Sequence, residues 1–304
     1  MMNATAVCKR LLSLSLEQSR SGTVHSVFDR AVNLEVGGGA GFIGLIAQQG
    51  ALTPYAVSVR TEHPFPEAGV RAGMAAAILG GKILIPQAEL EIDLTNAEPV
   101  DLRVDSIELR YGGEAERALM ERIVSALGGA DAEASLAALV IGGTGNAYTK
   151  FLAPRLEQLY AAVSVGAREA AALAAARTAG CGMGLTPSSD DLLTGYFTTL
   201  HLLFRAEGRE HLRGILPTMA RAAAEKTNRI SGTFLLHGGE GLANAAMCDL
   251  YRSTFQFMDT AAAKRAAERV LAIGSTSGAD MLTGAALALL HHGGTSTMEG
   301  TNKW

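Results

Sequence analysis

The C-terminal part of the chain contains the segment Ser188-Ser189-Asp190-Asp191-Leu192-Leu193-Thr194-Gly195. It aligns without gaps on Ser277-Gly278-Ala279-Asp280-Met281-Leu282-Thr283-Gly284, and the two share Ser, Asp, Leu, Thr and Gly at five of eight positions. Each copy follows a lead rich in Gly and Thr, residues 180–187 in the first and 274–276 in the second. Serine followed three residues later by an acidic residue, before an apolar run, is a helix-start pattern. The repeat therefore predicts two helices that begin alike.

The sequence around this repeat has helical periodicity over long stretches rich in Ala and Leu. Small residues on so many helix faces allow close packing, which favours a compact helical bundle whose glycine-rich loops carry the chemistry. We assign residues 112–304 to this mostly α-helical domain. The helices are expected over residues 114–127, 156–179, 191–205, 260–272 and 280–291.

Before residue 112 the pattern has a period of two. Apolar and polar residues alternate over residues 32–36, 56–60 and 90–94, which is typical of half-buried strands. Their spacing favours a mostly antiparallel meander or small barrel over alternating strands and helices. The sequence thus predicts an α+β protein in which residues 1–111 form a mostly β domain.

The composition and charge of the chain argue against several classes of protein, including nucleic-acid-binding and membrane proteins. Charged residues make up 18% and hydrophobic residues 48%, as expected for a folded chain with a sizeable core. The formal charge of −4 and the lack of a Lys/Arg-rich run argue against a nucleic-acid or anionic-membrane partner. No apolar run is long enough to span a membrane. Small polar or anionic metabolites remain as partners.

The three cysteines include no C-x-x-C pair, so neither a disulfide framework nor a cysteine zinc site is expected. Together with an N-terminus that lacks a convincing secretory signal, this favours the cytoplasm. The histidines show no H-x-x-x-H spacing, and His291-His292 is typical of a helix C-terminus stabilised by the helix dipole.

The glycine-rich leads offer backbone amides and hydroxyl groups just before helix N-termini, an arrangement that binds phosphate or carboxylate. Two such termini, brought together by pseudo-twofold packing, would hold one anion from both sides. Gly195 and Gly284 lie at matching places inside the helices, which indicates a packing requirement. The residues expected to bind substrate or phosphate here are Gly182, Gly184, Thr186, Ser188, Ser189, Ser277 and Gly278.

A plain structural explanation fits the same residues, because capping boxes are common and each stabilises a helix by only about 1 kcal/mol. A further glycine loop, residues 142–146, matches neither phosphate-loop nor dinucleotide-binding motifs. No motif therefore requires ATP, NAD or any other cofactor.

Residues 226–231 place two cations, an amide and hydroxyl groups together between helical stretches. As a site, Asn228, Arg229 and Ser231 would contact an anionic substrate, with Arg229 suited to bidentate bonds. As a solvated helix start, the segment would carry no ligand.

Asp190, Asp191 and Asp280 together could hold Mg²⁺, because hard cations prefer carboxylate oxygens. Adjacent helical residues point in different directions, so only one of Asp190 and Asp191 is expected to face Asp280. The repeat alignment favours Asp191. We expect Asp191, Asp280 and Asn228 to form the catalytic set.

The stretch from Gly182 to Gly195 closely resembles the G-x-G-L-T-P-S-G-D-D-x-L-x-G signature of the AllH-like family. Supporting similarity lies in residues 227–231, residues 274–280 and the strand pattern of residues 24–36, so the resemblance covers most of the chain. Ser189 stands where the family usually has glycine, a change that would stiffen the turn or restrict approach to a ligand.

This resemblance implies a subunit of the oxamate carbamoyltransferase of anaerobic allantoin breakdown, which interconverts oxalurate plus phosphate with oxamate plus carbamoyl phosphate. Other protein subunits of the pathway would be its partners. Backbone amides around Gly184 and residues 188–189 would bind phosphate or carboxylate. Asp191 and Asp280 would orient the loops or act in proton transfer.

Two other function classes stay open on the sequence. The chain would act as a non-catalytic binding or scaffold subunit if the chemistry belongs to a partner. It would act as a Mg-dependent hydrolase or phosphotransferase if the carboxylates gather around a metal ion.

Overall fold

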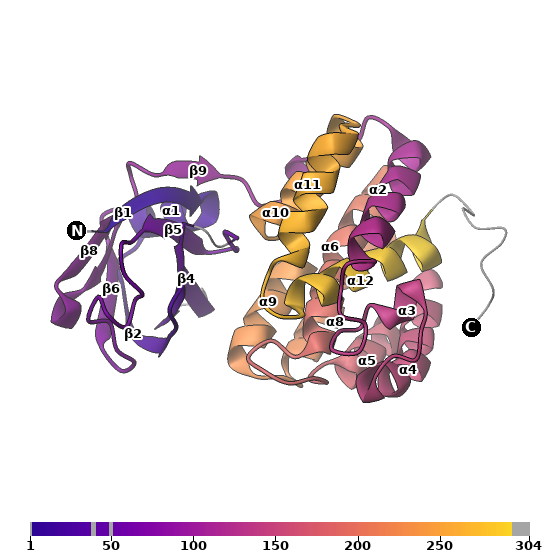
Figure 1. Cartoon of the computed structure of the whole chain (residues 1–304), viewed down its shortest axis with the longest axis horizontal. Coiled ribbons are helices and arrows are strands. Elements are labelled where there is room, and N and C mark those ends of the chain that lie inside the picture. Colours follow the sequence, from indigo (N-terminus) through magenta and orange to yellow (C-terminus); the bar gives the residue numbers. More distant parts are fainter. Residues whose placement is uncertain (1, 38–40, 49–50, 294–304) are drawn as a thin grey trace. The chain divides into compact units, whose positions relative to one another are not determined.

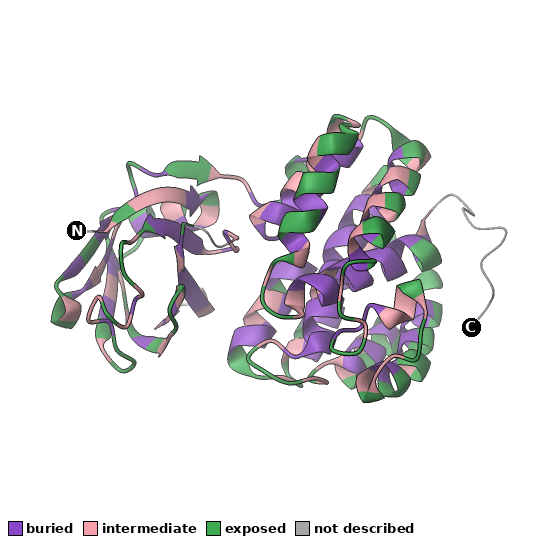
Figure 2. Cartoon of the chain, viewed as in Figure 1, coloured by how far each residue is buried: buried purple, intermediate pink, exposed green. Residues whose placement is uncertain are grey.

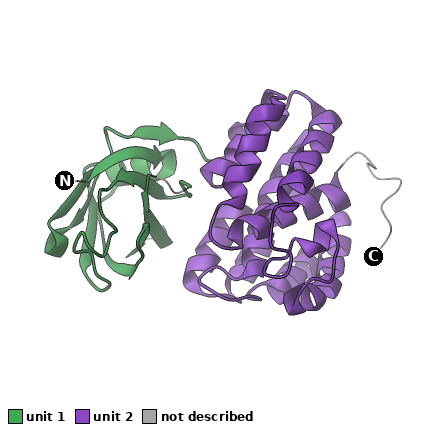
Figure 3. Cartoon of the chain, in the orientation of Figure 1, with its two compact units in different colours: residues 1–102 green, residues 103–304 purple. Residues whose placement is uncertain are grey.

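The computed structural model describes residues 2–37, 41–48 and 51–293 of the chain (Figure 1). It divides the chain into two compact units, Met1–Leu102 and Arg103–Trp304 (Figure 3). The change of periodicity near residue 112 marks the first long helix. The helical unit itself begins earlier, because residues 103–107 pack on its helices.

The N-terminal unit is built on one nine-stranded sheet with the order β8-β7-β6-β2-β3-β4-β5-β1-β9. All neighbouring pairs are antiparallel except β4 with β5 and β1 with β9. The sheet curves until β8 contacts β1, which makes it a half-barrel. Its elements are β1 (Asn3–Cys8), α1 (Lys9–Glu17), β2 (Arg20–Val27), β3 (Ala31–Val36), β4 (Gly41–Ala47), β5 (Ala56–Arg60), β6 (Ala75–Leu79), β7 (Lys82–Ile85), η1 (Pro86–Ala88), β8 (Leu90–Asp93) and β9 (Glu98–Val100).

Alternation of residue type explains the core of this unit. On β3, Val32, Leu34 and Val36 are buried while the residues between them are partly exposed, as the period of two predicts. The predicted strands at residues 32–36, 56–60 and 90–94 correspond to β3, β5 and β8. The mostly antiparallel β architecture is confirmed.

The second unit is helical. Its elements are η2 (Val104–Ser106), α2 (Gly112–Leu127), α3 (Ala138–Ile141), α4 (Ala147–Ser164), α5 (Arg168–Thr178), α6 (Ser188–Ala206), α7 (Glu210–Arg213), α8 (Leu216–Ala224), α9 (Arg229–Gly239), α10 (Ala245–Tyr251), the π-helical turn η3 (Arg252–Gln256), α11 (Thr260–Leu271) and α12 (Ser277–His292). The helices expected at 114–127, 191–205, 260–272 and 280–291 are confirmed as α2, α6, α11 and α12.

The single helix expected over residues 156–179 is wrong. Two helices, α4 and α5, lie there and are separated at Gly166, which has φ +67°. A glycine adopts this left-handed conformation without the strain that a side chain would add, so the chain can turn between the helices. The alanine-rich sequence on both sides hides this break.

Helices α6 and α12 form the centre of the helical unit. Nearly every residue of α6 is buried, and so is most of α12 (Figure 2). A helix that is buried on almost all sides lies inside a bundle rather than on its surface. The two helices of the repeat are therefore the central pair.

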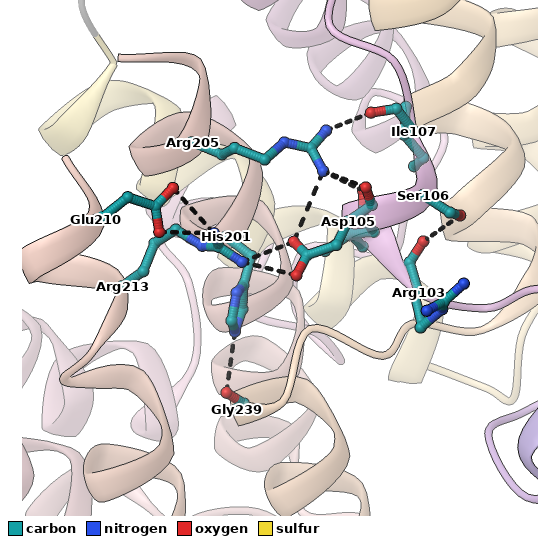
Figure 4. A network of polar contacts seen from close by, with 10 residues as sticks. Arg103, Asp105, Ser106, Ile107, His201, Arg205, Glu210, Arg213 and Gly239 are labelled. Atoms are coloured by element: carbon teal, nitrogen blue, oxygen red, sulfur yellow. Dashed lines mark hydrogen bonds and ion pairs between the residues drawn. The ribbon is translucent and has the colours of Figure 1, made fainter. Parts of the chain in front are cut away.

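A polar network fastens the first residues of the helical unit to α6 and α7 (Figure 4). Arg205 donates hydrogen bonds to the backbone carbonyls of Val104, Asp105 and Ile107. The Nη2 atom of Arg213 donates to both carboxylate oxygens of Asp105, at 2.8 and 2.7 Å. The His201 ring nitrogen Nε2 lies 2.9 Å from the Gly239 carbonyl on the neighbouring helix. These contacts, with the bridge between Arg103 and Leu242, explain why residues 103–107 belong to the helical unit.

Within the described ranges, none of the helices combines the length and the apolar character that crossing a bilayer would require.

Candidate functional site

The two copies of the repeat cross at their glycines. A Cβ atom on Gly195 would lie 2.0 Å from the Met281 carbonyl oxygen, and one on Gly284 would lie 1.9 Å from the Leu192 carbonyl oxygen. Leu192 and Met281 occupy equivalent positions in the repeat, so each glycine contacts the same point of the other helix. This reciprocity is the geometry of a pseudo-twofold axis, and it brings the N-termini of α6 and α12 together.

Hydrogen bonds across this axis are reciprocal as well. The Ser277 hydroxyl at the start of α12 donates to the Asp191 carboxylate of α6, and the Ser188 hydroxyl of α6 donates to the Asp280 carboxylate of α12. A threonine from each lead adds a second donor, Thr186 for Asp191 and Thr276 for Asp280. Each carboxylate is thus held by a serine from the opposite repeat.

The first lead also contacts the start of α12 directly. The Thr186 and Ser277 hydroxyl oxygens lie 3.2 Å apart. Both loops therefore contribute hydroxyl groups to one small region around the aspartates.

Asp191 and Asp280 are deeply buried and incompletely bonded. Their residues are 3% and 0% exposed, and the Oδ2 atom of each has no hydrogen-bond partner. The Oδ1 atom of Asp280 accepts a 2.7 Å bond from the Leu136 amide. Two buried acceptors without a donor are an unusual feature of a native fold, which makes this pair of carboxylates the candidate functional site.

Burial raises the pKa of both carboxyl groups. The pKa of Asp191 rises to about 7, with the hydroxyls of Ser277 and Thr186 opposing the shift and the Asp280 charge adding to it. The pKa of Asp280 rises to about 6, opposed by the Leu136 amide and by the Ser188 and Thr276 hydroxyls. No basic side chain is among the groups that shift either pKa. The pair therefore lacks a positive partner within the described chain, and its charge state changes near neutral pH.

Asp190 points elsewhere. Its Oδ2 accepts from the Thr227 and Ser231 hydroxyls, and its Oδ1 accepts from the Gly180 amide at 2.7 Å and lies 3.3 Å from the Ser189 hydroxyl. The carboxylate therefore fastens the glycine-rich lead to the start of α9. Adjacent aspartates pointing in different directions is what helical geometry predicts.

Asp190 does not join Asp191 and Asp280, because its carboxylate is bound to the lead and to α9; of the two neighbours, only Asp191 is held beside the start of α12, as the repeat alignment predicts. Across residues 2–37, 41–48 and 51–293, no three His, Cys, Asp or Glu side chains are grouped so that they could hold a metal ion.

Other predicted substrate-binding groups are engaged within the protein. The Ser189 amide donates to the Cys181 carbonyl, and the Ser189 hydroxyl accepts from the Cys181 amide. The amides of Asp190 and Asp191 donate to the Pro187 carbonyl. The Ser189 amide is therefore not free to hold an anion, which removes one donor from the expected cradle.

Asn228 caps α9. Its side-chain oxygen accepts from the Ser231 amide at 3.0 Å, and its side-chain nitrogen donates to the Leu185 carbonyl at 2.9 Å. Arg229 follows as the first residue of α9 and is exposed. Asn228 thus holds the lead through Leu185, and the Ser231 hydroxyl holds it through Asp190. The hydrogen bonds of both groups go to these partners and not to Asp191 or Asp280.

The glycines of the leads differ in their surroundings. A Cβ atom on Gly182 would lie 2.4 Å from the Ser188 amide nitrogen, and one on Gly278 would lie 1.9 Å from the Val270 carbonyl of α11. Both glycines are needed for close packing. Gly184 has φ +94° and open space around its Cβ position, so its backbone is accessible from solvent.

The glycine loop at residues 142–146 leads from α3 to α4. Asn146 caps α4 through the Thr149 amide, and its side-chain nitrogen donates to the carbonyls of Glu133 and Ser135. These bonds account for its conformation as a helix connection. The neighbouring Leu136 amide donates a hydrogen bond to Asp280. No local sequence pattern predicts this contact, because the two residues are 144 positions apart.

A second buried polar cluster lies at the end of α12. The Tyr196 hydroxyl is 2.6 Å from Nε2 of His292, and Tyr160 stacks on His291 with ring centroids 3.7 Å apart. Burial, with His291 and Arg209 nearby, lowers the pKa of His292 to about 3. His292 is therefore neutral at neutral pH, so the prediction that its charge stabilises this helix end is wrong. Its hydrogen bond with Tyr196 holds the helix end instead.

Two family models match the chain. Residues 178–289 match the model described as oxamate carbamoyltransferase subunit AllH, and residues 3–99 match the AllH family N-terminal domain. Neither a curated protein nor a solved structure matches. The first match spans both copies of the repeat, and the two together cover most of the chain.

Proposed function

The chain belongs to the AllH family, and from this we propose that it is the subunit of an oxamate carbamoyltransferase that binds a small substrate at the paired N-termini of α6 and α12. Its candidate substrates are carbamoyl phosphate, oxamate and oxalurate. The family match supports the reaction class, and the geometry of the two helix N-termini supports the choice of site.

One observation carries the proposal: two buried carboxylates, Asp191 and Asp280, each keep an oxygen without a hydrogen-bond partner at the point where the repeats meet. Burying an acceptor without a donor costs about 1–3 kcal/mol for each group, so two such oxygens at one point favour a ligand site over helix caps alone. Both aspartates lie inside the family-matched region.

The surrounding residues suit a site for a small metabolite. The hydroxyls of Thr186, Ser188 and Ser277 hold the carboxylates in place, so little reorganises when a ligand binds. Asp190 and Asn228 hold the lead against α9 as positioning residues. In this proposal the exposed backbone at Gly184 and the Arg229 side chain contact the anionic end of the substrate.

Calorimetric titration and thermal shift with carbamoyl phosphate, oxamate and oxalurate test the proposal. We expect at least one of them to raise the melting temperature of the native chain, because a ligand that binds only the folded state stabilises it. Asp191→Asn should make the shift much smaller, because one of the two acceptors is lost. Glu169→Gln, which changes an exposed carboxylate on α5, is the matched control and should leave it unchanged.

A scaffold subunit without a ligand site predicts a different result. In that case none of the three compounds shifts the native melting temperature, and Asp191→Asn leaves carbamoyl transfer by the assembled enzyme unaltered. That pair of results would reject the proposed site.

A further inference from the structure

The free acceptors of the aspartate pair restrict what can bind there. Asp191 and Asp280 each have one carboxylate oxygen held by hydroxyl or amide donors and a second, Oδ2, with none. A ligand that completes the site must therefore bring hydrogen-bond donors. A carboxylate or a fully ionised phosphate ester brings none, and it would meet two carboxyl groups without an intervening cation.

We propose that Asp191 and Asp280 bind the NH₂ group of the substrate's carbamoyl or carboxamide end, and that this pair makes the chain selective for primary amides over isosteres lacking N–H. The inference rests on the proposed function and deepens it, because it states which end of the substrate faces the repeat. The anionic end then points away from the pair.

The chemistry of the NH₂ group matches the two acceptors. A primary amide carries two N–H donors, one for each unpartnered oxygen, and it adds no charge to a buried site. The two aspartates are related by the pseudo-twofold axis of the repeat. The two N–H bonds of an NH₂ group lie on either side of its C–N bond, which matches that arrangement. A metal ion is a poorer match, since among the described residues no three His, Cys, Asp or Glu side chains lie together to hold one.

Burial gives the pair its discriminating power. An isostere with a methyl group in place of NH₂ fills the same volume but leaves both oxygens unsatisfied, and sites built to bond a donor reject such analogues strongly. Pyruvate is this isostere of oxamate, and acetyl phosphate is the isostere of carbamoyl phosphate. We expect at least about a 100-fold weaker binding of each isostere.

The experiment measures dissociation constants of all four compounds for the full chain at pH 8 by calorimetric titration, with melting curves as a folding check. Oxamate or carbamoyl phosphate should bind at least about 100-fold more tightly than its isostere. In Asp191→Asn and Asp280→Asn an amide group replaces the free acceptor. The preference should then fall to a few-fold, while Glu169→Gln keeps the native preference.

The outcomes separate the inference from the function on which it rests. Equal affinity for each compound and its isostere overturns the inference but leaves a substrate site in place. Binding of ammonium or methylammonium with no preference for amides also overturns it, in favour of a cation site. No binding of any compound by a correctly folded chain overturns the proposed function, and the inference with it.

Discussion

Asp190 and Asp191 are neighbours with opposite surroundings. Asp190 accepts bonds from the lead and from α9 with both of its oxygens, whereas Asp191 keeps one oxygen free. Asp190→Asn places an NH₂ group among donors and should lower the free energy of unfolding by about 2–4 kcal/mol. Asp191→Asn places its NH₂ where nothing is bonded and should leave the melting temperature as high as in the native chain. Thermal unfolding of both variants at pH 7 measures the contrast, and equal losses would contradict it.

The aspartate pair also predicts how stability depends on pH. The pKa values of Asp191 and Asp280 are raised to about 7 and about 6 in the folded chain, against 3.8 ordinarily. Between these values the folded state binds more protons than the unfolded state, so the free energy of unfolding falls as pH rises from about 4 to about 7. The loss from Asp191 reaches at most about 4 kcal/mol by pH 8.

Denaturant unfolding between pH 4 and pH 8 checks this sign. Asp191→Asn removes one titrating group, so its stability should fall less steeply and exceed that of the native chain at pH 8. A native stability that rises through this window, with the variant parallel to it, would contradict the raised pKa values.

For single residues, the sequence predicts which of them lie at the helix starts better than it predicts their hydrogen-bond partners. The alignment of the repeat separates Asp191 from Asp190, and the structure places the two in different surroundings. The Leu136 amide on Asp280 could not be predicted, because it depends on how distant segments pack. For the same reason the sequence did not show that Ser189, Asn228 and Ser231 use their polar groups within the fold.

The crossing of α6 and α12 depends on two glycines. Gly195→Ala or Gly284→Ala would push a methyl group into the backbone of the facing helix, which cannot move as a flexible side chain would. Each should destabilise the chain by about 3 kcal/mol or more despite the better helix propensity of alanine.

Gly238→Ala is the matched control. Its Cβ atom would lie 3.5 Å from the nearest atoms of Thr194, an ordinary contact, so alanine there should be neutral or stabilising by up to about 1 kcal/mol. Urea unfolding of the three variants measures the difference. A small effect at Gly195 would mean that the helices separate without loss.

Elements with strong periodicity are predicted well by the sequence. The strands β3, β5 and β8 and the helices α2, α6, α11 and α12 lie where alternation or helical spacing places them. The break between α4 and α5 is missed, since alanine is compatible with either side of the turn and only Gly166 marks it. Hydrophobic periodicity shows which face of a helix or strand is buried. It does not show where the chain turns within a run of small residues such as alanine.

The helical unit should be separable at its structural boundary. A fragment of residues 103–304 keeps the segment that Arg205 and Arg213 bind, and it pairs Arg103 with Leu242. A fragment of residues 112–304 removes the acceptors of residues 104–107 from both arginines and leaves Arg213 only Glu210. We expect the longer fragment to melt several degrees higher, because charge-assisted bonds are lost in the shorter one. Calorimetry compares them; equal melting temperatures would make the segment dispensable.

At the scale of the whole molecule, the sequence indicates two units of different class but not where they part. The change of period locates the first long helix at α2. Residues 103–111 have no long periodic element, and their assignment depends on side chains of α6 and α7 that lie about a hundred positions further along the chain.

The exchanged serines tie the fates of the two repeats together. Ser188 serves the carboxylate of the second copy and Ser277 that of the first, so each half of the duplication maintains the other. A substitution in one copy of the repeat therefore affects the carboxylate of the other copy. Among relatives, substitutions should be inherited in cross-matched pairs, position 188 with position 280 and position 277 with position 191, rather than accumulate within one copy.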